Sequence, residues 1–206
     1  MTSEVQMTAI QAGRRVRFLF DPDCPWAWRA SLWVREVARA RPLAIEWGLL
    51  SLEYVNRDRK DNPQALHQRK TGHALRLLAR ARQIAGNEGI DALYLAIGEA
   101  RHDEQQALDD ENMLAQAVAR AGLPAALVSS TGADPALDAE LEAGYAQACA
   151  GGAFGVPTLY IDGSEVPYYG PLIAAVPDGD EAVELWDHVV GLTRLRFFYE
   201  LKRKRL

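Results

Sequence analysis

The sequence predicts a mixed α/β fold in which an all-helical segment interrupts a small sheet. Residues 15–61 show the pattern strand, helix, strand, and residues 151–206 show the pattern strand, strand, helix. Between them, residues 62–150 carry almost only helical, alanine-rich patterns. Because a strand–helix–strand unit this short connects parallel strands, we expect the first two strands to lie parallel in one sheet.

The elements of the first unit follow in order. The apolar run at 15–20 ends at Asp21-Pro22, which indicates a buried strand. Pro25 suits the first turn of the next helix, because an N–H group there has no partner within the helix. Apolar residues recur at helical spacing from Trp26 to Ala38 and predict the buried face of that helix. The run from Leu43 to Trp47 predicts the second strand.

Turn and capping signals divide the insertion into several helices. Gly86-Asn87-Glu88-Gly89 is expected to break a long helix, and Gly122 to end a second one. Asp134-Pro135 has the residue types of an N-cap and a first helical position, so it predicts the start of the last helix in the insertion.

The last third of the chain returns to strands. Residues 155–161 are expected to form a loop that leads into a strand. Asp162-Gly163 predicts a hairpin turn, with the return strand at 166–168. Residues 180–201 predict a final amphipathic helix with Leu195 on its buried face.

Composition argues against several classes of partner. The 206 residues carry 28 acidic and 23 basic side chains, and this net charge of −5 argues against a nucleic-acid-binding surface. No apolar run approaches the length of a membrane span, about 20 residues, and the first residues lack the apolar stretch of a secretion signal. Two cysteines do not make a disulfide framework. We therefore expect a cytoplasmic protein with no nucleic-acid or membrane partner, as a monomer or a homodimer.

Metal and nucleotide sites are not predicted either. The four histidines show no metal-ligand spacing with one another or with the cysteines. The sequence also has no glycine-rich phosphate-binding motif.

Cys24 is the residue on which the functional prediction depends. It stands in Asp-Pro-Asp-Cys-Pro-Trp-Ala-Trp, residues 21–28, between the first strand and the first helix. Free amide groups at the start of a helix favour an anion, so we expect the thiol pKa of Cys24 to lie below its usual value of about 8.5. The alternative is a small buried apolar residue, as free cysteine often is. The strand–Cys-Pro-Trp–helix context favours a reactive cysteine.

Ala27 occupies the position three residues after Cys24. Reactive Cys-x-x-Cys motifs carry a second, resolving cysteine at that position. A redox site at Cys24 therefore has a nucleophile but no resolving thiol within the motif. The other cysteine, Cys149, falls in register with Leu137 and Leu141 on one helix face, which favours a packing role over a resolving one.

Val156-Pro157 opens the third predicted strand. The complete order of elements is that of a thioredoxin-like fold with an inserted all-helical domain. In such folds this proline is cis and lies against the reactive sulfur, and the residue before it offers its N–H and C=O groups to a bound thiol or peptide. The alternative is an ordinary proline at the start of a strand.

Together these motifs resemble the DsbA-like thioredoxin-fold family with a helical insertion. Within it, the chain resembles the cytoplasmic branch of actinobacterial mycothiol-dependent reductases, sometimes called nitroreductases. That branch usually has Cys-Pro-Trp-Cys, where Ala27 replaces the second cysteine here, and an aromatic pocket position, which is Leu66 here. The resemblance is carried by Phe20-Asp21-Pro22, Cys24-Pro25-Trp26, Trp28, Ser51-Leu52 with Asn56, Gly122-Leu123-Pro124, Gly155 to Thr158, Tyr169-Gly170-Pro171, and Phe197-Phe198 with Glu200-Leu201-Lys202.

The resemblance implies two domains and a set of site residues. It implies a discontinuous thioredoxin-like domain at 15–61 and 151–206 and a helical insertion domain at 62–150. It implies a catalytic Cys24, no metal, no tightly bound cofactor, and a low-molecular-weight thiol such as mycothiol as co-substrate. The residues implied to bind this thiol or the substrate are Pro25, Trp26, Ala27, Asn56, His102, Val156, Pro157 and Thr158. For Trp26 the alternative is a core position, and for His102 an exposed, solvated side chain.

Three functions follow from such a site. The first is a thiol-dependent oxidoreductase in which Cys24 forms a mixed disulfide with a small thiol, and a second small thiol resolves it. Its partners would be the small thiol and a small-molecule or disulfide substrate. The second is a thiol transferase or isomerase of the kappa glutathione transferase type, in which no protein disulfide forms. The third is a family member that binds a thiol or a peptide without turnover.

Overall fold

The computed structural model describes residues 14–58 and 71–203. Within them no helix is long and apolar enough to cross a membrane. Leu66 and the predicted boundary at 61/62 lie outside the described residues. In chain order the elements are β1 (Arg15–Phe20), α2 (Pro25–Ala40), β2 (Ala44–Leu49), α3 (Leu52–Asn56), α5 (Gly72–Gly98), the π-helix η1 (Glu99–Asp103), α6 (Glu111–Arg120), α7 (Ala126–Thr131), α8 (Pro135–Ala150), β3 (Thr158–Ile161), β4 (Tyr168–Tyr169) and α9 (Gly179–Thr193).

Among the described residues, the sheet has four strands in the order β2-β1-β3-β4. β1 and β2 are parallel, with Val16 opposite Ile45, which confirms the predicted βαβ unit. β3 runs antiparallel to β1 and to β4. The inner strand β1 ends at Phe20, directly before the loop that carries Cys24. Cys24 therefore lies at the carboxyl end of a buried strand.

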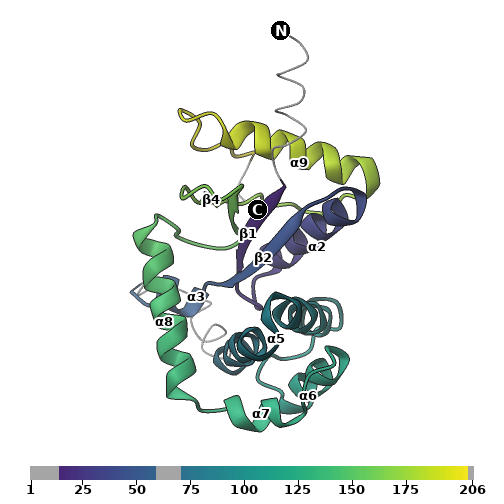
Figure 1. Cartoon of the computed structure of the whole chain (residues 1–206), viewed down its shortest axis with the longest axis vertical. Coiled ribbons are helices and arrows are strands. Elements are labelled where there is room, and N and C mark those ends of the chain that lie inside the picture. The colour runs from purple at the N-terminus through teal and green to yellow at the C-terminus, as the bar shows by residue number, and fades with distance from the viewer. Residues whose placement is uncertain (1–13, 59–70, 204–206) are drawn as a thin grey trace.

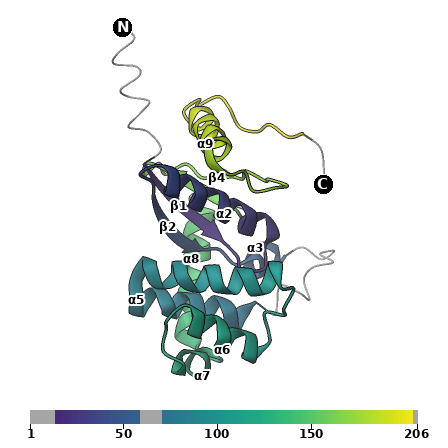
Figure 2. The same cartoon turned by 90° about the vertical axis from the view of Figure 1, so that its right-hand side faces the viewer.

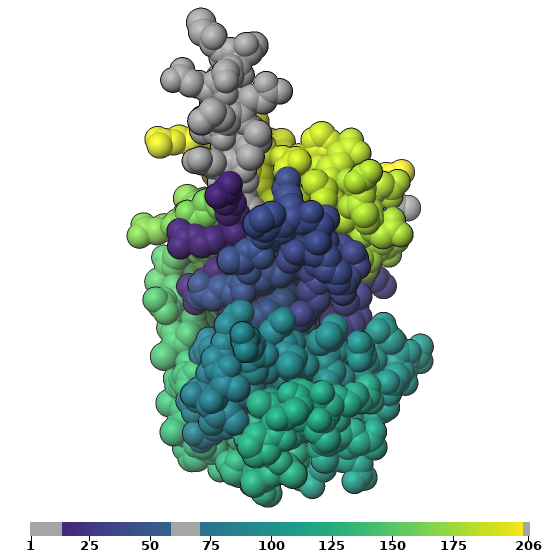
Figure 3. Space-filling view, turned by 45° about the vertical axis from the view of Figure 1, so that its right-hand side comes forward, coloured from purple at the N-terminus to yellow at the C-terminus, as the bar shows by residue number. Residues whose placement is uncertain are grey.

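The helices form layers on either side of the strands. α2 and α9 pack together near the sheet, with the indole rings of Trp33 and Trp186 at 5.6 Å and the Trp33 Nε1–H donating to Ala182 O at 2.9 Å. Helices α5, α6 and α7 lie together at the opposite end of the molecule from α9, and α8 runs back from α7 toward the sheet (Figures 1 and 2). On the face in Figure 3, α9, α2 and the α5–α6 region follow one another from top to bottom.

Aromatic side chains join the strands to the helices of the insertion. The ring of Phe20 on β1 stacks on Tyr94 of α5 at 3.6 Å, and Trp47 on β2 meets the same ring edge-on at 5.5 Å. Gly98, at the end of α5, lies so close to Trp28 of α2 that a Cβ there would stand 2.1 Å from the indole ring. The helices of the insertion therefore share one buried core with the strands.

The predicted break in the long helix is a kink. α5 continues from Gly72 to Gly98, but Gly86 has φ 62° and ψ −151°, outside the helical range. The next residue, Asn87, uses this bend: its side-chain amide accepts from Trp47 N and donates to Ile45 O, both at 2.8 Å. It thus pairs with the outer edge of β2 as a neighbouring strand would, which protects that edge from pairing with other chains.

The last third of the chain departs from the prediction twice. The turn at Asp162-Gly163 is confirmed, with φ of 53° and 79° at the two residues. The return strand, however, lies at 168–169 and not at 166–168, because Pro167 has no N–H group to give to a ladder.

The last helix is also shorter than predicted. α9 ends at Thr193 and does not reach Leu201, and Leu195 is 39% exposed, so its predicted buried position is wrong. The apolar residues after Thr193 include Leu195, Phe197, Tyr199 and Leu201, every second residue, and this spacing does not build one face of a helix.

Candidate active site around Cys24

Cys24 is the N-cap residue of α2. Its own N–H donates to Asp21 O at 3.1 Å, and its Sγ accepts from Ala27 N at 3.4 Å. The thiol lies 3.7 Å from Val156 O, to which it donates. The side chain is 6% exposed. The sulfur is thus held between the first turn of α2 and the loop before β3, segments 132 residues apart in the chain.

The pKa of the Cys24 thiol is raised, so the predicted lowering is wrong. Burial raises the pKa to about 11, and the charges of Asp21 and Asp23 act in the same direction. The hydrogen bond from Ala27 N lowers it, as the helix start was expected to do. The loss of solvation is the larger effect, because the sulfur is covered on the side of Val156.

The loop that meets the sulfur is fixed by its own hydrogen bonds. The Val156–Pro157 peptide bond is cis. Thr158, which is fully buried, donates from Oγ1 to Gly155 O at 2.6 Å, and Pro157 O accepts from Gly170 N at 2.8 Å. Thr158 therefore orients the loop from within.

The first turn of α2 presents three predicted site residues. Pro25 is exposed at the first helical position, and Ala27 is fully buried with its N–H aimed at the sulfur. Trp26 is half-buried: part of it packs against the core, and the guanidinium of Arg29 lies 5.1 Å from its ring. Both expected roles for Trp26, core and wall of a binding site, fit this position.

His102 contacts the loop before Cys24. Its Nε2–H donates to Pro22 O at 2.9 Å, and its ring stacks on Trp28 at 5.8 Å. Burial lowers its pKa, which favours the neutral ring. His102 is thus half-buried and not the solvated side chain that was its alternative. Its geometry suits holding the loop, since its Nε2 is engaged with a carbonyl oxygen.

The neighbours of His102 reinforce this contact. Arg101 forms an ion pair with Asp23 at 2.8 Å, and Asp103 accepts from Trp28 Nε1 at 3.4 Å. Arg101, His102 and Asp103 lie in η1, a π-helical turn, a rare geometry that often occurs at functional sites. A cavity of about 280 Å³ lies here, lined by Pro25, Trp28, Arg29, Leu32, His102, Asp103, Ala175 and Val176.

Asn56 is linked to the site through its helix. Its Nδ2 donates to Leu52 O at 2.9 Å within α3. The N–H of Leu52, at the start of that helix, donates to Asp21 Oδ2 at 2.7 Å. The structure therefore ties α3 to the Cys24 loop through Asp21.

Asp21 is a site residue that the sequence analysis took only as the end of a strand and as part of a family motif. Its side chain is fully buried, and its carboxylate accepts from Asp23 N at 2.9 Å as well as from Leu52 N. Burial raises its pKa to about 7. The sequence signal for this role was an acidic residue directly after an apolar strand. A carboxylate at the end of a buried strand is itself buried only when it has partners, so its position indicated a hydrogen-bonded structural role.

Phe154 and Tyr169 were also missed as neighbours of the sulfur. Their ring centroids are 5.0 Å apart, and both flank the segment that carries Val156. Tyr169 had entered only as part of a family motif. The sequence signal for such neighbours was the presence of aromatic residues on each side of the strand that Pro157 opens.

Cys149 was expected to pack on one helix face with Leu137 and Leu141. Both cysteines are free, and Cys149 lies half-buried on α8 beside Tyr145. On the same helix, Leu137 and Leu141 are buried against α5. Within 14–58 and 71–203, no group of His, Cys, Asp and Glu side chains is arranged to hold a metal ion.

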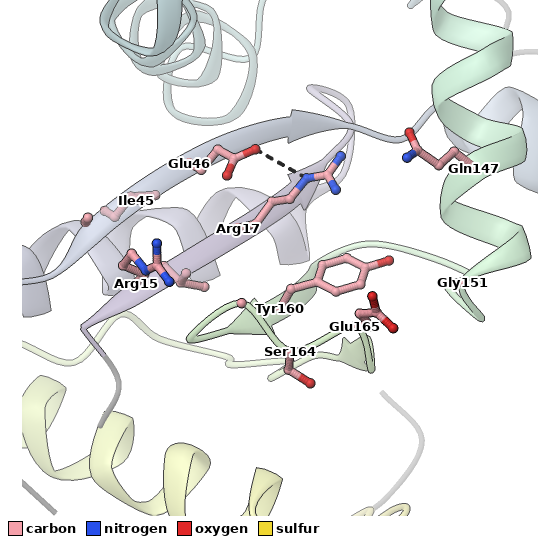
Figure 4. A pocket seen from close by; sticks show the side chains of 12 residues that line it. Arg15, Arg17, Ile45, Glu46, Gln147, Gly151, Tyr160, Ser164 and Glu165 are labelled. Carbon is pink, nitrogen blue, oxygen red and sulfur yellow. Dashed lines mark ion pairs between the residues drawn. The ribbon is translucent and has the colours of Figure 1, made fainter. Parts of the chain in front are cut away.

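A larger groove of about 670 Å³ lies at the other end of β1 (Figure 4). Arg17 of β1 pairs there with Glu46 of β2 at 3.5 Å, and its guanidinium lies 5.7 Å from the Tyr160 ring. Arg15 and Glu165 also line the groove. It contains none of the predicted site residues, and Cys24 follows the opposite end of the strand.

Comparisons with known proteins agree with this geometry. A family model described as Rv2466c-like, mycothiol-dependent nitroreductase Rv2466c, matches residues 23–203. The uncharacterized protein Rv2286c of Mycobacterium tuberculosis (strain ATCC 25618 / H37Rv) is 30% identical over 190 residues, which are 92% of this chain and 82% of that protein.

Solved structures share the fold at low identity. The probable DsbA oxidoreductase SCO1869 from Streptomyces coelicolor has a TM-score of 0.59 and 17% identity, covering 93% of each chain. The cytosolic disulfide reductase DsbM from Pseudomonas aeruginosa with GSH has a TM-score of 0.56 and 17% identity, covering 89% of this chain and all of that one (100%). A 2-hydroxychromene-2-carboxylate isomerase has a TM-score of 0.60 and 17% identity, covering 88% and 95%. The predicted DsbA-like thioredoxin fold is confirmed.

Proposed function

The chain belongs to the Rv2466c-like family of mycothiol-dependent nitroreductases, and we propose that it is a thiol-dependent oxidoreductase that works through one cysteine, Cys24. The position of the sulfur carries this proposal. Cys24 Sγ lies between the Ala27 N–H and the Val156 carbonyl, where the fold presents a reactive sulfur to a ligand. Ala27 leaves the motif without a second thiol, so the resolving thiol must come from solution.

The exchange balances with two small thiols. The Cys24 thiol loses its proton, and the thiolate attacks one sulfur of a disulfide R–S–S–R′, forming Cys24–S–S–R and releasing R′–S⁻. A second small thiolate, R″–S⁻, then attacks the R sulfur and releases R–S–S–R″ and the Cys24 thiolate. One disulfide is reduced, one is formed, and the protein returns to its starting state. Mycothiol, named in the family description, is the small thiol that we propose as co-substrate, with no tightly bound cofactor.

The surrounding residues divide into two groups. Pro25 and Trp26 follow Cys24 on α2, and Val156 and Pro157 belong to the loop that meets the sulfur. These four residues are proposed to contact the bound thiol, with the backbone of Val156 as its hydrogen-bonding partner. Ala27 N–H, which meets the sulfur, is proposed to stabilise the thiolate when it forms. In this proposal the ligand is received by the thioredoxin-like part of the chain, in the cytoplasm.

The remaining predicted residues are proposed to position the site. Thr158 fixes the Val156 loop through Gly155 O, and His102 fixes the Cys24 loop through Pro22 O. Asn56, which the family resemblance places at the site, belongs to the helix that Asp21 ties to the same loop. The domains at 15–61 with 151–206 and at 62–150 are proposed to meet where η1 contacts the Cys24 loop.

A second function is favoured by the raised pKa. A thiol with a pKa of about 11 is protonated near neutral pH, which suits a site that binds another molecule's thiol without forming a protein disulfide. This is the chemistry of a thiol transferase or isomerase.

Mass measurement separates these functions. The protein is incubated with the disulfide of mycothiol, quenched with a thiol-blocking reagent and weighed, with Cys24→Ser and Cys149→Ser variants beside it. We expect one mycothiol adduct on the unaltered protein and on Cys149→Ser, and none on Cys24→Ser. If Cys24 carries only the thiol-blocking reagent and never a disulfide-bonded mycothiol, the oxidoreductase is refuted and the transferase is favoured. An adduct that mycothiol cannot remove would indicate binding without turnover.

A further inference from the structure

Phe154 and Tyr169 are two exposed aromatic residues next to the reactive sulfur. Phe154 is 63% exposed and Tyr169 is 45% exposed. Their ring centroids are 5.0 Å apart, with 33° between the ring planes. By contrast, Trp33, Trp47 and Trp186 are buried. This pair therefore presents aromatic surface to solvent where the fold does not need it for its core.

Both residues lie on segments that flank Val156, the residue whose carbonyl contacts Cys24. Phe154 is two residues before Val156, whose carbonyl oxygen lies 3.7 Å from Cys24 Sγ. Tyr169 on β4 is paired with Thr158 on β3, the second residue after Val156. A Cβ at Gly155 would stand 3.0 Å from the Tyr169 ring, so this ring covers Gly155 directly.

Two further contacts agree with this placement. Burial raises the pKa of Tyr169 and a charge on Cys24 adds to this rise, so the phenol and the sulfur lie within electrostatic reach of each other. Gly155 is the residue that lets the ring approach the loop, because any side chain there would have to displace it. The two rings thus lie beside the loop whose Val156 carbonyl contacts the sulfur.

We propose that Phe154 and Tyr169 form a subsite for a planar aromatic group carried by the sulfur that reacts with Cys24. This inference rests on the proposed function and adds a preference among substrates: aromatic disulfides over aliphatic ones. A ring bound to sulfur in Cys24–S–S–R lies a few bonds from Cys24 and can stack on Phe154 or Tyr169. Stacked aromatic pairs favour such a complex beyond the area that they bury.

The test compares two neutral disulfides on one thiol. In a Cys149→Ser background, Cys24 thiolate displaces a thiopyridone from 4,4′-dithiodipyridine, or 2-mercaptoethanol from bis(2-hydroxyethyl) disulfide. The proton of the thiol goes to solvent, and the protein gains the other half of the reagent as a mixed disulfide. The rates are measured by absorbance and by mass, and the quantity compared is the ratio of the aromatic rate to the aliphatic rate.

Phe154→Ala and Tyr169→Ala are each expected to lower this ratio about three- to tenfold, the factor that one ring contact contributes. Tyr169→Phe keeps the ring and should keep the ratio. Ile84→Ala, at an exposed apolar position on α5, serves as the control and should leave both rates unchanged. Circular dichroism and thermal unfolding establish that each variant is folded.

The outcomes separate the two proposals. If both alanine variants keep the ratio of the unaltered protein, the aromatic subsite is wrong while the proposed function stands. If Tyr169→Phe lowers the ratio as much as Tyr169→Ala does, the hydroxyl and not the ring acts, and the subsite is again wrong. If Cys24 reacts with neither disulfide, the proposed function fails and the subsite with it.

Discussion

Burial in the folded protein disfavours the charged form of the Asp21 carboxyl group. Burial raises its pKa from 3.8 to about 7, against the two backbone N–H groups that favour the charged form. Because the folded pKa is higher than the unfolded one, protonation of Asp21 stabilises the folded state. Its contribution is fully present below about pH 4 and is lost as the pH rises through about 7. About three pKa units at 1.4 kcal/mol each correspond to about 4 kcal/mol.

Asp21→Asn should remove this pH dependence. The amide keeps the size of the carboxylate and carries no charge, but only its oxygen can accept a hydrogen bond. One of the N–H groups of Asp23 and Leu52 then loses its partner, which costs about 1–3 kcal/mol at every pH. We expect the variant to be the less stable protein at about pH 4 and to equal or exceed the unaltered protein above about pH 8.

Urea unfolding followed by tryptophan fluorescence measures this at a series of pH values. Other titrating groups act equally in both proteins, so the difference between the two free energies of unfolding isolates Asp21. Asp178→Asn, at an exposed position before α9, is the matched control for an aspartate-to-asparagine change. A difference between Asp21→Asn and the unaltered protein that does not change with pH would refute the argument from burial.

Three further predictions test the site and its packing. In a variant that also carries Cys149→Ser, Ala27→Cys should form a disulfide with Cys24 on oxidation, because the Ala27 N–H already contacts the sulfur. Two free thiols in the folded, oxidised variant would show that the motif geometry is wrong. Alkylation of Cys24 by iodoacetamide should still be accelerating above about pH 9, since burial raises its pKa to about 11, and a plateau below that pH would contradict this. Gly98→Ala should destabilise the protein by about 2 kcal/mol through a clash with Trp28, whereas Gly144→Ala, on a helix with open space around it, should stabilise it by about 0.5–1 kcal/mol in thermal or urea unfolding; equal effects would refute the close packing of Gly98.

Local patterns in the sequence were enough to predict most of the fold. The strand at 15–20, the helix that begins at Pro25 and the cap at Asp134 follow from periodicity and from residues whose conformational preference is strong. The predicted end of α9 was wrong because the apolar residues that follow Thr193 were interpreted as a continuation of the buried helix face. Whether such residues find a partner surface depends on the rest of the fold, which local spacing does not report.

The chemistry of the site could be predicted only in part. The sequence identified Cys24 and Val156, because a reactive cysteine at a helix start and a proline-led strand are local motifs. The pKa of the thiol depends on how completely the Val156 loop covers it, and this is a tertiary property. His102 was placed at the site by family resemblance, and the structure brings it to Pro22, where it supports the loop.

The raised pKa of Cys24 acts on both halves of the proposed exchange. At pH 7 a thiol with a pKa of about 11 is ionised in about one molecule in 10⁴, which slows formation of the mixed disulfide, although a more basic thiolate is also the better nucleophile. Resolution requires Cys24 to leave as a thiolate, and a thiol of high pKa leaves slowly. We therefore expect the Cys24 mixed disulfide to persist once formed. Asp21→Asn removes a charge that raises this pKa, so the adduct should be released faster by added thiol in that variant. An equal or longer adduct lifetime, measured by mass against time, would refute this link between Asp21 and the sulfur.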